Sequence, residues 1–303
     1  MALPVIAITA GDPSGIGPEI ALKAASDSRV TDVCRPVIYG PATAALLAAF
    51  PAGVVHAASG RAAYDAIVLA VQDALSGRVA AVVTAPINKA AFAAAGLPWP
   101  GHTELFAHLC GATDVAMMFW SDPLRVVLAT VHIPLAEVPR TLTTERLDRI
   151  IRLTARSLPG FGVASPRIAV AALNPHAGEQ GLLGREDDEV LAPAVAAARA
   201  SGIDVAGPFP ADTLFVRASR GEFDVVIAAY HDQGLVPVKL LAFGRSVNVT
   251  IGLPIIRTSV DHGTAFDIAR QGVADEGSLV EATLLAATLV GRRGQTRVRP
   301  QVV

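Results

Sequence analysis

The segment at residues 224–269 reads DVVIAAYHDQGLVPVKLLAFGRSVNVTIGLPIIRTSVDHGTAFDIA, and its pattern decides the expected fold. The apolar run at 225–229 predicts a buried parallel strand, because such strands are covered on both faces. The residues YHDQG at 230–234 follow at once, and open α/β sheets bind ligands at the carboxyl ends of their strands. Anion-binding side chains and a Gly-containing turn come next: Lys239, Asn248, Arg257 and the DHGTA of 261–265. The alternative is an ordinary strand–helix unit without a site.

The composition is typical of a globular protein. The chain has 303 residues, of which 52% are apolar and 17% charged, so it can bury a large core in one or two domains. The net charge of −2 argues against nucleic acid as a partner. Two cysteines are too few for a disulfide framework and have no metal-type spacing.

The sequence also predicts where the protein resides. The first residues, MALPVIAITAGDPSG, lack the basic region that precedes the apolar part of a signal peptide. No apolar run approaches the ~18 residues that a membrane-spanning helix needs. We therefore expect a cytoplasmic protein with no membrane partner.

Short apolar runs alternate with helical patterns along the rest of the chain, which is typical of an α/β fold. One pair of runs, 115–120 and 125–130, surrounds Ser121-Asp122-Pro123 and predicts a hairpin. The other expected strands cover residues 5–9, 36–39, 79–83 and 167–172.

Three histidines, His132, His176 and His231, each come directly after or near the end of such a strand. Because neighbouring strands lie about 5 Å apart, side chains at their ends can converge. Three imidazoles suit a catalytic divalent metal such as zinc, with magnesium, cobalt or manganese as alternatives. A single histidine in such a place is more often structural, so the prediction rests on all three. Asp212 and Asp232 are candidates for proton transfer or for orienting the ligands.

Two helix starts are candidate anion sites. The sequence AGDPSGIGPE at 10–19 joins a strand to a helix opened by Pro18, and its free N–H groups predict a nucleotide or anion site. Its spacing is not that of the Gly-x-Gly-x-x-Gly fingerprint, and a tight turn that only requires glycines is the alternative. At 100–104, PGHTE opens another helix, where Thr103 can cap and His102 can face a phosphate or carboxylate. A plain capping turn is the alternative there.

Seven stretches, in order, resemble the 4-hydroxythreonine-4-phosphate dehydrogenase (PdxA) family of vitamin B6 synthesis: GDPSGIGPEI, TAPINKAAF, GHTELF, LNPHAGE, PADTLF, YHDQGLVPVK and IRTSVDHGTAFDIA. The resemblance extends from about residue 8 to residue 274. It implies an isocitrate/isopropylmalate dehydrogenase-like fold, with two α/β/α domains, a cleft between them and a homodimeric assembly. We expect one domain at 1–100 plus 245–303, with the termini and much of the cofactor site. The other, 101–244, is expected to carry the metal ligands and the dimer interface.

The resemblance also implies roles for particular residues. The three histidines become metal ligands shared across the dimer interface, and the cofactor becomes NAD or NADP. The implied substrate-binding residues are His102, Thr103, Lys239, Asn248 and Arg257, and the catalytic candidates are Asp212, Asp232 and Lys239. The implied cofactor-binding residues are Gly11, Asp12, Gly15, Gly17, Asp261, His262, Gly263 and Asp267. The region between residues 39 and 62 is shorter than is usual in the family.

The expected reaction is metal-dependent oxidative decarboxylation of a phosphorylated β-hydroxy acid. The resemblance implies conversion of 4-phosphohydroxy-L-threonine to 3-amino-2-oxopropyl phosphate in pyridoxal phosphate biosynthesis. Relatives that oxidise threonate or erythronate 4-phosphate, or an aromatic cis-dihydrodiol, are alternatives. Retention of His102, Thr103 and Glu104 favours a phosphorylated substrate. From the residues alone, a metal-dependent hydrolase and a non-catalytic sugar-phosphate sensor stay open.

Overall fold

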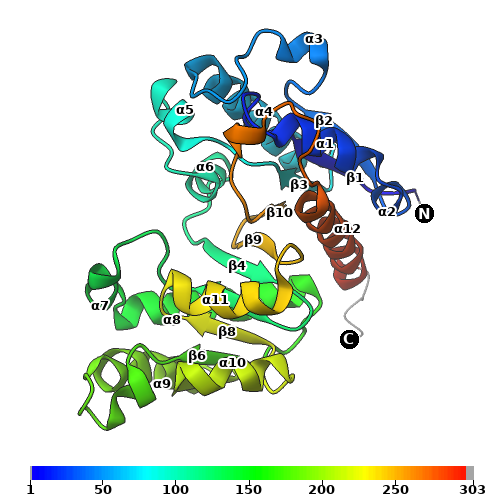
Figure 1. The fold of residues 1–303 in the computed structure, drawn as a ribbon. Helices are drawn as coiled ribbons and strands as arrows, with labels where there is room; N and C mark the ends of the chain where they lie inside the picture. Colours follow the sequence, from blue (N-terminus) through cyan, green and yellow to red (C-terminus); the bar gives the residue numbers. More distant parts are fainter. Residues whose placement is uncertain (1, 298–303) are drawn as a thin grey trace. The chain divides into compact units, whose positions relative to one another are not determined.

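The computed structural model describes residues 2–297, and the chain divides into two compact units (Figure 1). Unit 1 comprises residues 1–115 and 247–303, and unit 2 comprises residues 116–246. Residues 101–115, which we expected in the second domain, therefore group with unit 1. The reason is packing: Leu105 and Phe106 are buried in the same hydrophobic cluster as Ile67 and Phe92.

The sheet of unit 1 has the strand order β2-β1-β3-β10-β9. These strands are β1 (Val5–Thr9), β2 (Arg35–Tyr39), β3 (Ala81–Thr84), β9 (Val247–Ile251) and β10 (Ile256–Ser259). All neighbouring pairs are parallel except β9 and β10, which are antiparallel. The parallel arrangement explains the continuous apolar sequences of β1 and β3, since both faces of these strands are covered.

Helices cover the sheet of unit 1. These helices are α1 (Gly17–Ser26), α2 (Ser28–Thr31), α3 (Ala44–Leu47), α4 (Ala57–Leu75), α5 (Lys89–Ala94), α6 (His102–Leu109) and α12 (Gly277–Arg297). Ala7 and Val82 share one hydrophobic cluster with Ile67 and Val71 of α4. The C-terminal helix α12 packs against β10, β3 and α1, so the two ends of the chain build one core.

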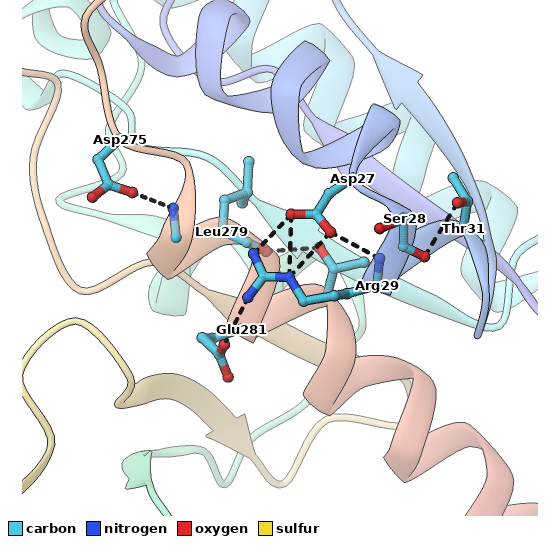
Figure 2. Close-up of polar contacts among 9 residues, drawn as sticks. Asp27, Ser28, Arg29, Thr31, Asp275, Leu279 and Glu281 are labelled. Atoms are coloured by element: carbon cyan, nitrogen blue, oxygen red, sulfur yellow. Dashed lines mark hydrogen bonds and ion pairs between the residues drawn. The ribbon is translucent and has the colours of Figure 1, made fainter.

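Polar contacts add to the packing between α2 and α12 (Figure 2). The side chain of Asp27 accepts a hydrogen bond from the Arg29 backbone N–H (2.8 Å) and caps α2. The Arg29 guanidinium pairs with Asp27 at 2.7 Å and lies 3.8 Å from Glu281 of α12. Because Arg29 is exposed, water and salt screen these pairs and they add little to stability, so the buried apolar side chains of α12 hold it in place.

The sheet of unit 2 has the order β4-β5-β8-β6-β7. Its strands are β4 (Ala116–Trp120), β5 (Arg125–Leu128), β6 (Ile168–Ala171), β7 (Val205–Phe209) and β8 (Val225–Ala228). The antiparallel pairing of β4 with β5 confirms the predicted hairpin. The remaining pairs are parallel, so the ends of β5, β6 and β8 meet at one edge.

Helices also cover the sheet of unit 2: α7 (Val138–Thr141), α8 (Thr144–Ser157), α9 (Ala192–Ala200), α10 (Ala211–Ser219) and α11 (His231–Ala242). Leu214 of α10 and Leu235 of α11 pack in one cluster with Val226 of β8. Helix α9 contacts both α8 and β7. Across residues 2–297, no helix has the length and apolarity needed to cross a membrane.

Candidate functional site

The most unusual buried side chain is Arg257 on β10, which is 2% exposed. Its Nη1 donates to the Thr250 hydroxyl (3.0 Å) and its Nη2 to the Thr84 hydroxyl (2.7 Å). The guanidinium carbon lies 5.4 Å from the centroid of the Phe106 ring. Burial lowers the pKa of Arg257 to about 9, opposed by the charge of Glu104, so the side chain stays cationic at neutral pH. Unit 1 therefore holds a positive charge in a desolvated position.

Three buried polar atoms of predicted substrate-binding residues have no hydrogen-bond partner among the described residues: Arg257 Nε, His102 Nε2 and Asn248 Oδ1. A buried polar group without a partner costs about 1–3 kcal/mol, so such groups signal a missing ligand or water. The β9–β10 register pairs Ser259 with Asn248. Because side chains alternate along strands, Asn248 lies on the same face as Thr250 and Arg257.

His102 belongs to the same region of unit 1. Its ring centroid lies 6.3 Å from that of Phe106, the ring that also borders Arg257. Burial, and next the positive charge of Arg257, hold the pKa of His102 well below its usual value. The imidazole is therefore neutral at physiological pH and available as a hydrogen-bond donor or acceptor.

The start of α6 differs from the expectation in one respect. We predicted that Thr103 caps this helix, but Gly101 occupies the N-cap position and no side chain caps it. Gly101 has extended backbone, which leaves His102 and Thr103 inside the first turn. The first N–H groups of an uncapped helix favour an anion. The structure thus brings together His102, Arg257 and Asn248, next to a helix start that includes Thr103.

The turn at residues 10–19 also differs from the expectation of free N–H groups. The N–H of Asp12 donates to Pro86 O, that of Ser14 to the Asp12 carboxylate, and that of Ile16 to Thr264 O. Gly11, Gly15 and Gly17 are needed for close packing, since a Cβ on each would lie 2.2–2.7 Å from a backbone oxygen. Several N–H groups of the turn are therefore used within the protein, and its glycines allow the tight approach of backbone segments. Burial raises the pKa of Asp12, whose Oδ2 has no partner in the described chain.

The second predicted cofactor segment, 261–267, lies against this turn. Thr264 O accepts the Ile16 N–H at 3.0 Å, and Arg270 donates to Pro13 O (3.2 Å) and Phe50 O (2.7 Å). His262, Gly263 and Asp267 are exposed, and Asp261 accepts a hydrogen bond from Ser278 (3.3 Å). The segment is therefore anchored at its backbone while several of its side chains face outward. Its role in cofactor binding stays a prediction.

Two of the three predicted metal ligands are neighbours in unit 2. The ring centroids of His132 and His231 lie 5.6 Å apart. His231 Nδ1 lies 2.7 Å from the Asp232 carboxylate. A carboxylate at Nδ1 favours a proton there and leaves Nε2 free for a metal, which is how many metal-binding histidines are oriented. Gln233 fixes this edge by accepting from Ala229 N and donating to Ala172 O, both at 2.7 Å.

His176 is exposed and lies in a different structure, the turn Pro175–Glu179 after β6. Its φ of 51° lies in the left-handed region, which costs a non-glycine residue about 1–2 kcal/mol. The fully buried Asp187 accepts from the N–H groups of Leu173 (2.7 Å) and Asn174 (3.0 Å) and anchors the turn. No group of three or more metal-binding side chains assembles among the described residues. The imidazole donors of His132 and His231 fit a metal, and the part of His176 in such a site stays a prediction.

The remaining predicted residues also lie in unit 2. Asp212 is exposed in the first turn of α10, and Lys239 is half-buried in the last turn of α11.

The sequence did not predict a role for Thr84, Asp187 or Gln233. Thr84 stands in the TAPINK stretch, but its partner Arg257 is 173 positions away, so nothing local indicated the contact.

Comparison with known proteins agrees with the predicted resemblance. A sequence model of the family described as "Pyridoxal phosphate biosynthetic protein PdxA" matches residues 17–286. The chain is 47% identical to the 4-hydroxythreonine-4-phosphate dehydrogenase of Beijerinckia indica subsp. indica, over 91% of this chain and 92% of that protein. It is 44% identical to the D-threonate 4-phosphate dehydrogenase of Cupriavidus necator, over 96% of this chain and 98% of that protein.

Solved structures are also similar. The crystal structure of the 4-hydroxythreonine-4-phosphate dehydrogenase of Klebsiella pneumoniae matches with a TM-score of 0.86 and 40% identity, over 95% of this chain and 99% of that chain. The isocitrate dehydrogenase of Methylococcus capsulatus matches with a TM-score of 0.50 and 18% identity, over 97% and 88% of the two chains, which confirms the expected fold type. The chain belongs to the PdxA family.

Proposed function

We propose that the chain is a metal-dependent, NAD- or NADP-linked dehydrogenase that oxidatively decarboxylates 4-phosphohydroxy-L-threonine in pyridoxal phosphate biosynthesis. The family and the names of its relatives support this reaction. The observation in the structure that supports it most is the buried cationic Arg257 beside the unpartnered Nε2 of His102. A buried charge is stable only when it is paired, and a phosphate supplies the counter-charge.

Each unit carries its own candidate groups. In unit 1, Arg257 and the neutral His102 bind the phosphate, with Asn248 and the first turn of α6 beside them. In unit 2, Asp232 keeps a proton on Nδ1 of His231, and Gln233 ties the ends of β6 and β8 together. His132, His176 and His231 would hold a divalent metal, which would supply Lewis acidity when bound. Zinc suits three imidazoles, and magnesium, cobalt and manganese are alternatives.

The candidate groups for proton transfer lie in unit 2. Lys239, Asp212 and Asp232 are the candidates for taking the hydroxyl proton and for protonating the product. Lys239 is half-buried, whereas Asp212 and Asp232 are exposed.

The cofactor and assembly complete the proposal. The exposed side chains at 261–267 are the candidates for holding the adenosine end of a nicotinamide nucleotide, which would supply the hydride acceptor. We expect a homodimer, because the described part of one protomer does not gather three metal-binding side chains. A cytoplasmic location remains part of the proposal.

D-threonate 4-phosphate is the second candidate substrate, because a relative named for it is 44% identical. It carries the same phosphate and differs at the carbon next to the carboxylate, where it has a hydroxyl in place of an amino group. An aromatic cis-dihydrodiol lacks a phosphate for Arg257 and is disfavoured.

Purified protein with a divalent metal and NAD or NADP tests the proposal. Each candidate substrate is supplied in parallel, and reduced nicotinamide is followed by absorbance. The proposal predicts turnover of 4-phosphohydroxy-L-threonine with carbon dioxide release. Faster turnover of D-threonate 4-phosphate would transfer the assignment to that substrate, and turnover of neither would reject a phosphate dehydrogenase.

A further inference from the structure

Arg257 is held only by neutral groups within the described residues. Its two terminal nitrogens donate to the hydroxyls of Thr250 and Thr84, and its aliphatic and aromatic surroundings include the Phe106 ring. Glu104 acts on it electrostatically but is exposed. Neutral acceptors fix the guanidinium without cancelling its charge, so the whole charge remains available to an anionic ligand.

The Thr84 hydroxyl is itself oriented by a second hydroxyl. Thr84 Oγ1 donates to Ser259 Oγ at 2.9 Å, and Ser259 Oγ donates to the Thr84 carbonyl at 3.3 Å. All three residues are buried. The single hydroxyl proton of Thr84 is therefore committed to Ser259, and its lone pairs face the guanidinium. Such chains of hydrogen bonds reinforce one another in a low-dielectric interior.

The sheet register explains why these residues meet. Strands β3 and β10 are parallel, and Ser259 pairs with Thr84. Because side chains alternate along a strand, Arg257 lies on the same face as Ser259, two positions away. Two terminal nitrogens of Arg257 are thus anchored on one face of unit 1. Its Nε, which has no partner in the described chain, is left for a ligand.

We infer that Thr84, oriented by Ser259, is a positioning residue that holds the Arg257 guanidinium ready for the substrate phosphate. The inference rests on the proposed function, since it assumes that Arg257 binds phosphate. It assigns Thr84 a role through Arg257, without contact with the reacting atoms. Valine has nearly the shape of threonine but no hydroxyl, and serine keeps the hydroxyl, so the two substitutions separate packing from hydrogen bonding.

The test compares wild type, Thr84→Val and Thr84→Ser in binding of inorganic phosphate by calorimetry on the dimer or monomer as purified. Steady-state kinetics with the phosphorylated substrate accompany it. Thr84→Val is expected to weaken phosphate binding and raise KM by about tenfold, the effect of one lost hydrogen bond to a charged group, with a smaller change in kcat. Thr84→Ser is expected to stay within about twofold of wild type in both measurements.

Each outcome decides the inference. Normal phosphate binding by folded Thr84→Val overturns it but leaves the proposed function in place. Absence of phosphate binding by wild type overturns both the anion site and the inference. If Thr84→Val does not fold, Ser259→Ala replaces it. Weaker phosphate binding by that variant supports the inference, and unchanged binding overturns it.

Discussion

His132 and His231 lie side by side in unit 2, with ring centroids 5.6 Å apart, although they are 99 positions apart in the sequence. They come from segments that follow β5 and β8, which are paired in parallel. His176 follows β6 on the other side of β8, on a turn of its own. We predict that all three histidines hold one metal and that two protomers share the site.

Complementation between variants tests shared ligation. His176→Ala and His231→Ala are each expected to lose metal binding and turnover. After the two are mixed, unfolded and refolded together, heterodimers should regain one intact site, because each subunit supplies the histidine that the other lacks. The measurement is metal content by mass spectrometry, together with nicotinamide reduction.

The pair His132→Ala and His231→Ala is the matched control, and it should give no recovery, since both rings lie together in one protomer. Equal recovery by both pairs would contradict the arrangement. Full metal content in any single variant would remove that histidine from the site.

The strand-end histidines and the hairpin were predictable because apolar runs and polar strand ends are local patterns. Contacts between distant segments were not. Nothing near Thr84 in the sequence indicates that its hydroxyl accepts from Arg257, since the register of β3 and β10 decides this contact. The turn at 10–19 shows the same limit: its glycines were recognised, but the segment that uses its N–H groups, at Thr264, lies far along the chain.

Asp187 is expected to stabilise the turn that carries His176. Asp187→Asn replaces an acceptor of two backbone N–H groups with a neutral amide, so it should lower the free energy of unfolding by about 1.5–3 kcal/mol. It should also weaken metal binding. The neighbouring Asp188 is exposed, and Asp188→Asn should change stability by no more than about 0.5 kcal/mol. Urea denaturation measures both, and equal effects of the two substitutions would refute the anchoring role.

Position 15 is expected not to tolerate a side chain in place of glycine. A Cβ there would lie 2.7 Å from Thr264 O and 2.9 Å from Thr264 Cβ, so Gly15→Ala must displace the 261–267 segment. We expect a loss of about 1–3 kcal/mol in unfolding free energy and a higher KM for the nicotinamide cofactor. Gly291 of α12 is exposed with nothing within 4 Å, so Gly291→Ala is the control that should be neutral or stabilising. Wild-type stability and KM in Gly15→Ala would show that the segment tolerates displacement.

His102 predicts a particular dependence of stability on pH. Its pKa in the folded protein is well below its unfolded value of about 6.5. Below about pH 6.5 the unfolded chain therefore binds a proton that the folded protein resists, and stability falls as the pH decreases. Above about pH 6.5 neither the folded nor the unfolded chain binds this proton, so His102 does not lower the stability there. The free energy of unfolding should therefore decrease less between about pH 7 and pH 5 in His102→Asn than in wild type.

The exposed His108 provides the control for this experiment, because His108→Asn should keep the wild-type pH dependence. Denaturant titrations at several pH values, without phosphate, give the slopes. An unchanged slope in His102→Asn would show that His102 is not the group responsible.

The phosphate specificity of Arg257 is the central claim. Arg257→Met removes the charge from a buried position and should lower kcat/KM for the phosphorylated substrate by about ten- to hundredfold, equivalent to about 1.5–3 kcal/mol. Arg217→Met changes an arginine that is paired with Glu222 in unit 2 and serves as the control. A folded Arg257→Met protein is required, as shown by its circular dichroism.

The most direct measurement is the ratio of kcat/KM for 4-phosphohydroxy-L-threonine to kcat/KM for the same compound without its phosphate, in wild type and in Arg257→Met. A phosphate site at Arg257 predicts that the ratio falls at least about tenfold in the variant, because the unphosphorylated compound never used the charge. An unchanged ratio, with both substrates losing activity alike, would contradict the assignment of Arg257 to the phosphate.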